Sequence, residues 1–128
     1  MNPGKNRGTA EVEHLAARDF AEGRLLRPGV WAVAFVADWC PFCRAFLAPF
    51  AELRGAGPFE IAFGDVTDEE SPLWDDFRIE VVPTVVGFRE GRAVYRRNGV
   101  HGVGLLEEDL AAIRAEMGRI GSPSKSSA

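Results

Sequence analysis

The apolar residues of the chain fall into separated runs, and their spacing predicts alternating strands and helices. Residues 30–36 form an almost unbroken apolar run, which is typical of a strand buried on both faces. Shorter apolar runs predict the remaining strands, at residues 59–63, 84–88 and 93–97. Apolar positions at helical spacing predict helices over residues 44–53 and 105–117, and a short helix around residues 73–77 whose Trp74 is expected in the core.

The N-terminal part of the chain is predicted to be helical. Val12, Leu15 and Phe20 recur at helical spacing, so residues 10–22 predict an amphipathic helix that ends at Gly23. The predicted order of elements is α, β, α, β, α, β, β, α, which places the chain in the α/β class. Its strand–helix–strand unit should form a right-handed crossover.

The only two cysteines lie in the stretch Trp39-Cys40-Pro41-Phe42-Cys43, between a predicted strand and a predicted helix. A Cys-x-x-Cys at such a strand–turn–helix indicates redox chemistry. Cys40 falls at the expected N-cap, where unpaired backbone N–H groups and the helix dipole favour its thiolate. Cys43 lies one turn further in and is expected to be more buried. We therefore expect Cys40 to attack a substrate disulfide and Cys43 to resolve the mixed disulfide.

Three other interpretations of the cysteine pair have less support. A zinc site needs two more ligands, and only His14 and His101 remain, without ligand-like spacing. A structural disulfide that closes so short a loop adds little stability. Two buried thiols without a function are the third alternative. The strand–turn–helix context favours redox chemistry over all three.

Length and charge restrict the partners that we expect. With 128 residues the chain has the size of one domain, and its net charge of −4 without a basic block argues against nucleic acid. No apolar run approaches the ~20 residues of a membrane span. Residues 1–8 are polar and predict a flexible arm rather than a signal peptide, so we expect a cytoplasmic location without membrane contact. Residues 121–128 are Ser-rich and predict a disordered tail.

Four separate motifs make the chain resemble the thioredoxin family from about residue 10 to 118. These are the W-C-x-x-C motif at 39–43, the cis-proline segment Val82-Pro83-Thr84, the hairpin turn Phe88-Arg89-Glu90-Gly91 and the loop glycine Gly99. The resemblance implies a thioredoxin-like domain over residues 9–120. It would contain a central mixed sheet of four strands, or five, with helices on both faces.

The resemblance also implies a function and a set of site residues. It implies a thiol–disulfide oxidoreductase that reduces protein disulfides by cycling Cys40 and Cys43, without a cofactor or a metal. The Val82–Pro83 bond would be cis. The expected partners are protein disulfides and a reductase, thioredoxin reductase, that supplies electrons to a monomeric chain in cellular redox homeostasis. The residues expected to bind substrate are Trp39, Pro41, Phe42, Val82, Pro83 and Gly99.

The chain departs from the family pattern at positions that bear on the chemistry. The pair between the cysteines is Pro41-Phe42 instead of Gly-Pro and looks closer to the Pro-Tyr of glutaredoxins. The family's buried Asp and its Lys partner would fall at Ala34 and Gly64, so Cys43 lacks its usual base. Two alternatives therefore stand beside the main prediction. One is a glutaredoxin-like oxidoreductase that uses glutathione, and the other is a redox-poor module that binds proteins.

Overall fold

A computed structural model describes residues 11–122 and shows a mixed five-stranded sheet with the order β1-β5-β4-β6-β7. The strands are β1 (Glu13–Leu15), β4 (Val30–Val36), β5 (Glu60–Asp65), β6 (Thr84–Arg89) and β7 (Arg92–Asn98). β5 pairs in parallel with both β1 and β4, whereas β6 pairs antiparallel with β4 and with β7. The predicted α/β class and mixed sheet are confirmed, and the sheet has five strands, the larger of the two expected numbers.

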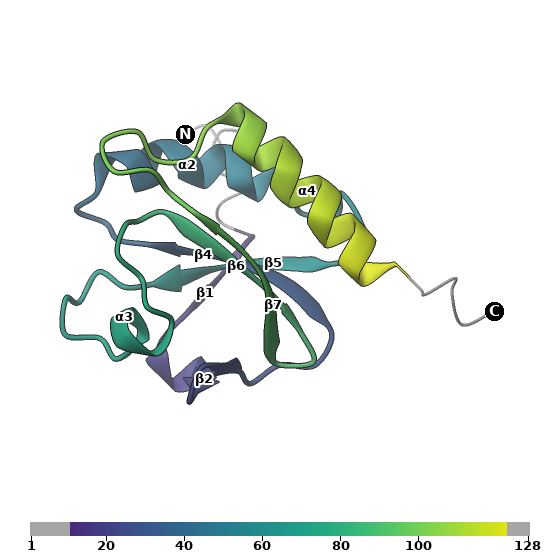
Figure 1. Cartoon of the computed structure of the whole chain (residues 1–128), viewed down its shortest axis with the longest axis horizontal. Coiled ribbons are helices and arrows are strands. Elements are labelled where there is room, and N and C mark those ends of the chain that lie inside the picture. Colours follow the sequence, from purple (N-terminus) through teal and green to yellow (C-terminus); the bar gives the residue numbers. More distant parts are fainter. Residues whose placement is uncertain (1–10, 123–128) are drawn as a thin grey trace.

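Helices cover both faces of this sheet. They are α2 (Pro41–Ala51), α3 (Leu73–Asp76) and α4 (Glu107–Gly121). Figure 1 shows α2 and α4 together on one face, with α3 and a small hairpin on the other. The hairpin consists of β2 (Phe20–Ala21) and β3 (Arg24–Leu25). Among residues 11–122, none of the helices combines the length and the apolar character that a membrane span requires.

Aromatic side chains fill the core on both faces of the sheet. The cluster on the α3 face has ring centroids 5.2–6.1 Å apart and consists of Phe20, Phe35, Phe77 and Phe88. The cluster under α2 has centroids 5.5 and 5.6 Å apart and consists of Phe46, Phe50 and Phe63. Each fully buried ring stabilises the fold by roughly 1.5–3 kcal/mol. These two clusters hold β4 and α2, and therefore the segment between them, in a fixed position.

The helix predicted for residues 10–22 is wrong over the described part of that range. The chain instead forms β1, a turn of 3-10 helix η1 (Ala17–Asp19) and β2. Val12, Leu15 and Phe20 are buried, as the periodicity requires, but a short strand followed by a turn buries the same three positions. The fifth strand therefore lies inside the segment that was predicted to be a helix.

Long-range contacts explain why this segment is not helical. β1 adds to the free edge of β5, with Glu13 opposite Ala62, so its backbone joins the sheet ladder. Arg27 donates to both carboxylate oxygens of Glu13, at 2.8 and 2.6 Å, and also pairs with Asp19. Helix propensity is a weak preference that such pairing overrides.

The predicted arm (1–8), domain (9–120) and tail (121–128) extend beyond the described residues at both ends.

Candidate functional site

Cys40 lies at the N-cap of α2, where the chain passes from β4 into the helix. Its backbone is extended (φ −101°, ψ 114°), and its Sγ accepts a hydrogen bond from the Cys43 amide at 3.3 Å. Pro41 occupies the first helical position, where its missing N–H leaves no acceptor unpaired. The position predicted from the sequence is thus confirmed, and a helix N–H points at the sulfur where an anion is stabilised.

Cys43 lies one turn deeper and is only 1% exposed. Its Sγ accepts a hydrogen bond from the Ala37 amide at 3.5 Å. Burial raises the pKa of the Cys43 thiol to about 12, although the Ala37 N–H and the charge of Arg44 act in the opposite direction. The Cys43 thiol therefore keeps its proton well beyond neutral pH.

The segment before β6 faces Cys40 from across the site. The Val82–Pro83 bond is cis, as the resemblance implied. The Cys40 thiol donates to the Val82 carbonyl at 3.5 Å. The Val82 amide donates no hydrogen bond to any residue of the described range. The segment thus places the Val82 carbonyl against the Cys40 sulfur, and the Val82 N–H has no partner within residues 11–122.

Thr84 and Gly99 support this segment from behind. Thr84 is the only fully buried polar side chain in residues 11–122, and its hydroxyl donates to the Val81 carbonyl at 2.6 Å. The same hydroxyl oxygen accepts from the Gly99 amide at 3.4 Å. A Cβ at Gly99 would collide with the carbonyl of Pro83, so only glycine lets the two backbones approach this closely.

A surface cleft of about 320 Å³ opens over Cys40. Five of the predicted site residues line it, namely Trp39, Cys40, Pro41, Phe42 and Val82. Pro83 and Gly99 do not line the cleft and instead shape its wall from behind. The lining residues that the sequence did not indicate are Trp74, Glu80, Val81, His101 and Gly102. Trp74 comes from α3 and the other four from loops at the same end of the sheet, and no local sequence pattern connects them.

Trp74 was predicted to belong to the core, and the structure corrects this in part. The side chain is half-buried and packs against the core, but its ring also stacks on Trp39, with centroids 6.3 Å apart and planes 8° apart. Its position at the cleft follows from α3, which carries it to the end of the sheet where Cys40 lies. A stretch of four helical residues has too few turns to show this orientation as a periodic pattern.

The expected loss of a buried base is visible in the structure. Ala34 is fully buried on β4, three positions before the Ala37 amide that contacts Cys43. A Cβ at Gly64 would lie 2.6 Å from the Phe35 ring, so Phe35 occupies the space that a larger side chain would need. Apolar packing therefore surrounds Ala34 and Gly64, the two positions where the resemblance would place the family's buried Asp and its Lys partner.

Neither of the two acidic residues near the site contacts Cys43. Asp38 and Asp65 are both exposed, and neither makes a hydrogen bond to Cys43. The Asp65 carboxylate instead accepts from the Thr67 amide at 2.9 Å. Within residues 11–122, no group of three or more His, Cys, Asp or Glu side chains is placed to hold a metal ion. The zinc alternative therefore has no ligand set in this part of the chain.

Comparison with known proteins agrees with this geometry. The thioredoxin family model matches residues 11–112. Thioredoxin H5 of Arabidopsis thaliana is 34% identical over 69% of this chain and 71% of its own length. A thioredoxin of Neurospora crassa is 30% identical over 85% of this chain and 88% of its own.

Solved structures give the same result. A point-mutant thioredoxin of Halobacterium salinarum superimposes with a TM-score of 0.64 at 26% identity, covering 88% of this chain and 94% of its own. Mitochondrial thioredoxin 3 of Saccharomyces cerevisiae superimposes with a TM-score of 0.63 at 18% identity, covering 86% and 96%, which supports the fold alone. The chain therefore belongs to the thioredoxin family.

Proposed function

We infer that this thioredoxin-family chain is a thiol–disulfide oxidoreductase, and we propose that Cys40 and Cys43 carry the reaction on protein disulfides. The observation that supports this most strongly is the unequal placement of the two sulfurs. Cys40 faces the cleft and receives a helix N–H, whereas Cys43 is buried behind it with the pKa of its thiol raised to about 12. A nucleophile in front and a protonated thiol behind suit a two-step exchange.

The proposed reaction transfers two electrons and two protons to the substrate. The Cys40 thiolate attacks one sulfur of the substrate disulfide, which forms a mixed disulfide and releases the other sulfur as a thiolate that takes up a proton. Cys43 then loses its proton, and its sulfur attacks the Cys40 sulfur. The Cys40–Cys43 disulfide forms, and the second substrate sulfur leaves as a thiol. The protein dithiol is oxidised as the substrate disulfide is reduced.

Substrate recognition would use the backbone as well as the cleft. An extended peptide next to the disulfide can accept a hydrogen bond from the free Val82 amide, in the manner of strand addition. Trp39 and Phe42 are 47% and 41% exposed, which is high for large apolar side chains, and both lie beside Cys40. We propose that they provide the apolar contact for the substrate, while Pro83 and Gly99 keep the opposite wall in place.

The remaining partners follow from the need to regenerate the dithiol. A chain that ends its reaction as a Cys40–Cys43 disulfide requires an electron donor, and we propose thioredoxin reductase for this role. We further propose that the chain works as a monomer in the cytoplasm, without a cofactor, and away from nucleic acid and membranes. Size-exclusion chromatography and fractionation of cells that express the tagged chain would test the oligomeric state and the location.

The direct experiment is the reduction of insulin disulfides with dithiothreitol as the electron source. The wild-type chain should accelerate the reduction, and Cys40→Ser should abolish the acceleration. Cys43→Ser should stop at the mixed disulfide of the first step, which mass spectrometry can detect when the reduced variant is mixed with insulin without dithiothreitol. If either serine variant keeps the full rate, the proposal is wrong. Strict dependence on glutathione would indicate the glutaredoxin-like alternative, and substrate binding without any turnover would indicate the binding module.

A further inference from the structure

Two stacked tryptophans form one wall of the cleft beside Cys40. The Trp39 indole donates to the Thr67 carbonyl at 2.9 Å, and the Trp74 indole donates to the Asp68 carbonyl at 3.1 Å. Both rings are thus tied to the same loop, and their planes lie within 8° of each other. A pair held this way presents a fixed aromatic surface, so little ordering is required when a ligand binds to it.

A carboxylate completes this side of the cleft. Glu80 is exposed, lies two positions before Val82, and is the only Asp or Glu among the lining residues. It makes no ion pair with any residue in 11–122, and no Lys or Arg lines the cleft. Within residues 11–122, Glu80 therefore has no Lys or Arg partner at the cleft, and the one lining side chain that can become a cation is His101.

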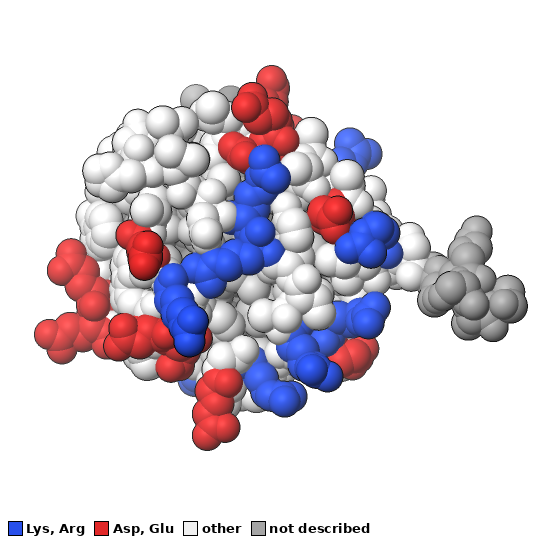
Figure 2. All heavy atoms as spheres, viewed as in Figure 1, with Lys and Arg blue, Asp and Glu red and all other residues white. Residues whose placement is uncertain are grey.

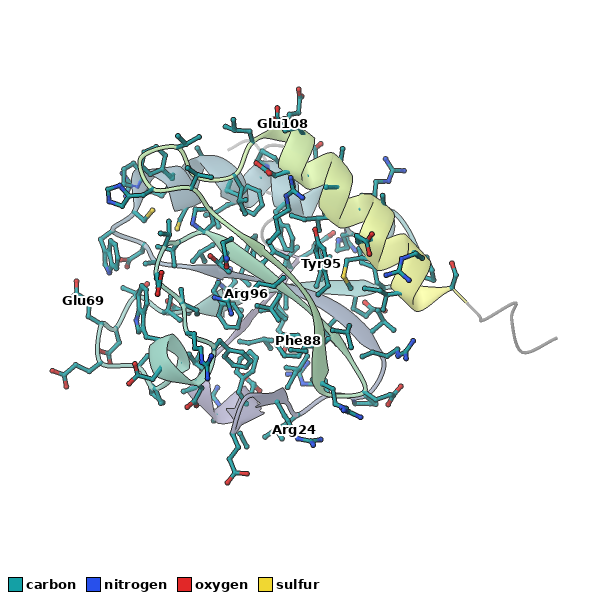
Figure 3. The ribbon with its side chains drawn as sticks, viewed as in Figure 1. Arg24, Glu69, Phe88, Tyr95, Arg96 and Glu108 are labelled. Carbon is teal, nitrogen blue, oxygen red and sulfur yellow. The ribbon has the colours of Figure 1, made fainter. Side chains whose placement is uncertain are left out.

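The wall that carries Glu80 is anchored from β7. The Arg96 guanidinium donates to the carbonyls of Phe77 and Arg78, just after α3. Figure 3 labels Arg96 on β7, and also Glu69 in the loop between β5 and α3. Because Arg96 uses its donors on these carbonyls, it fixes the segment between Trp74 and Glu80. The aromatic surface and the carboxylate are parts of one supported structure.

We propose that this cleft selects disulfide substrates that carry an arginine or lysine next to the disulfide. The substrate cation would lie against the exposed surface of the Trp39–Trp74 pair and interact with Glu80. Aromatic faces attract cations through their quadrupole, and a carboxylate without a partner adds a direct charge interaction. This inference rests on the proposed function and adds a substrate class to it. Trp74 and Glu80 act as specificity residues.

The test compares peptide dimers joined by one disulfide, whose cysteine is flanked by arginine, serine or glutamate. Reduced protein is mixed with each dimer, and the second-order rate of a single turnover is followed by acid quench and mass spectrometry. Each rate is divided by the rate at which dithiothreitol reduces the same dimer, because flanking charge also changes the reactivity of the disulfide. We expect the arginine dimer to react about fivefold faster than the glutamate dimer.

Glu80→Gln should lower this preference to about twofold, because it removes the charge and keeps the shape. Glu60→Gln is the matched control. It makes the same change in net charge at the start of β5, at the opposite end of the parallel strands from Cys40, and should keep the full preference. Trp74→Phe should keep more of the preference than Trp74→Leu, since only the former retains an aromatic face.

Two results would overturn the inference while leaving the proposed function intact. The first is equal normalised rates for the arginine and glutamate dimers with the wild-type chain. The second is an equal loss of preference in Glu60→Gln and Glu80→Gln, which would assign the effect to net charge alone. A wild-type chain that reduces neither these dimers nor 2-hydroxyethyl disulfide would overturn the proposed function itself, and this inference with it.

Discussion

Cys40 and Cys43 lie close together at the start of α2, yet their surroundings suit opposite tasks. Cys40 receives the N–H of Cys43 and borders the cleft, whereas Cys43 is enclosed by core residues and contacts the Ala37 amide. A buried thiol without a neighbouring base keeps its proton, and the proton must leave before the sulfur can attack. The resolving step is therefore the step that the surroundings of this chain make difficult.

The rate of that step should depend on pH in a characteristic way. Because the pKa of Cys43 is raised to about 12, the thiolate fraction grows throughout the neutral and mildly alkaline range. Decay of a preformed mixed disulfide on Cys40 should accelerate by about tenfold per pH unit from about pH 7 to 10. The measurement is release of a labelled peptide thiol in a stopped-flow instrument. A plateau below about pH 9 would indicate that another group takes the proton.

The raised pKa of the Cys43 thiol also links this residue to the stability of the reduced protein. The folded state holds the thiol proton up to about pH 12, whereas an ordinary thiol loses it near 9.0. The unfolded state then binds fewer protons between these values, so the free energy of unfolding falls as pH rises from about 9 towards 12. Below about pH 9 the protonated Cys43 thiol makes its full contribution to the free energy of unfolding.

Urea unfolding at a series of pH values under reducing conditions measures this effect. Cys43→Ser lacks the titrating thiol, so its stability should fall less steeply above about pH 9 than that of the wild type. Cys40→Ser keeps Cys43 and should retain the steeper fall. Parallel curves for the wild type and Cys43→Ser would contradict the link between burial and proton binding at this residue.

At the scale of elements, the end of β7 positions the cis-proline segment. A Cβ at Gly99 would meet the Pro83 carbonyl, a backbone atom that cannot rotate away. Gly99→Ala should therefore cost about 2 kcal/mol in the free energy of unfolding and slow insulin reduction, because the wall of the cleft must move. Gly118→Ala on α4 is the control, since nothing lies within 4 Å of its Cβ. It should be neutral or stabilise by about 0.5–1 kcal/mol. Equal effects of the two variants would contradict this role of Gly99.

The elements also show which parts of the structure a single sequence reveals. The strand over 30–36 was predicted correctly because its unbroken apolar run admits few other structures. The cysteine motif placed the start of α2, since a capping residue followed by proline defines a helix N-terminus. β1 was missed because three residues gain their strand conformation from the edge of β5, a contact outside any local window. The place of Trp74 and Glu80 at the cleft was missed for a similar reason, because the cleft brings together a helix and loops that are far apart in the sequence.

At the scale of the whole molecule, charge is distributed unevenly around the cleft end of the sheet. Figure 2 shows a largely uncharged surface near the start of α2, with acidic side chains gathered below it and basic ones towards the middle and right. The net charge of the chain is only −4, but its acidic side chains are concentrated in this part of the surface. Such an arrangement favours cationic partners at short range and loses its influence as salt is added.

The reduction potential of the Cys40–Cys43 pair shows whether this chain can act as a reductant of protein disulfides. The protein is equilibrated in thiol–disulfide buffers of defined potential, alkylated, and the reduced fraction is read by mass spectrometry. We predict a single two-electron transition to one intramolecular disulfide, nearer to about −270 mV than to about −120 mV, as suits a reductant. A pair that forms only mixed disulfides with the buffer thiol, or one with a potential near about −120 mV, would contradict the assignment of this chain as a reductant of protein disulfides.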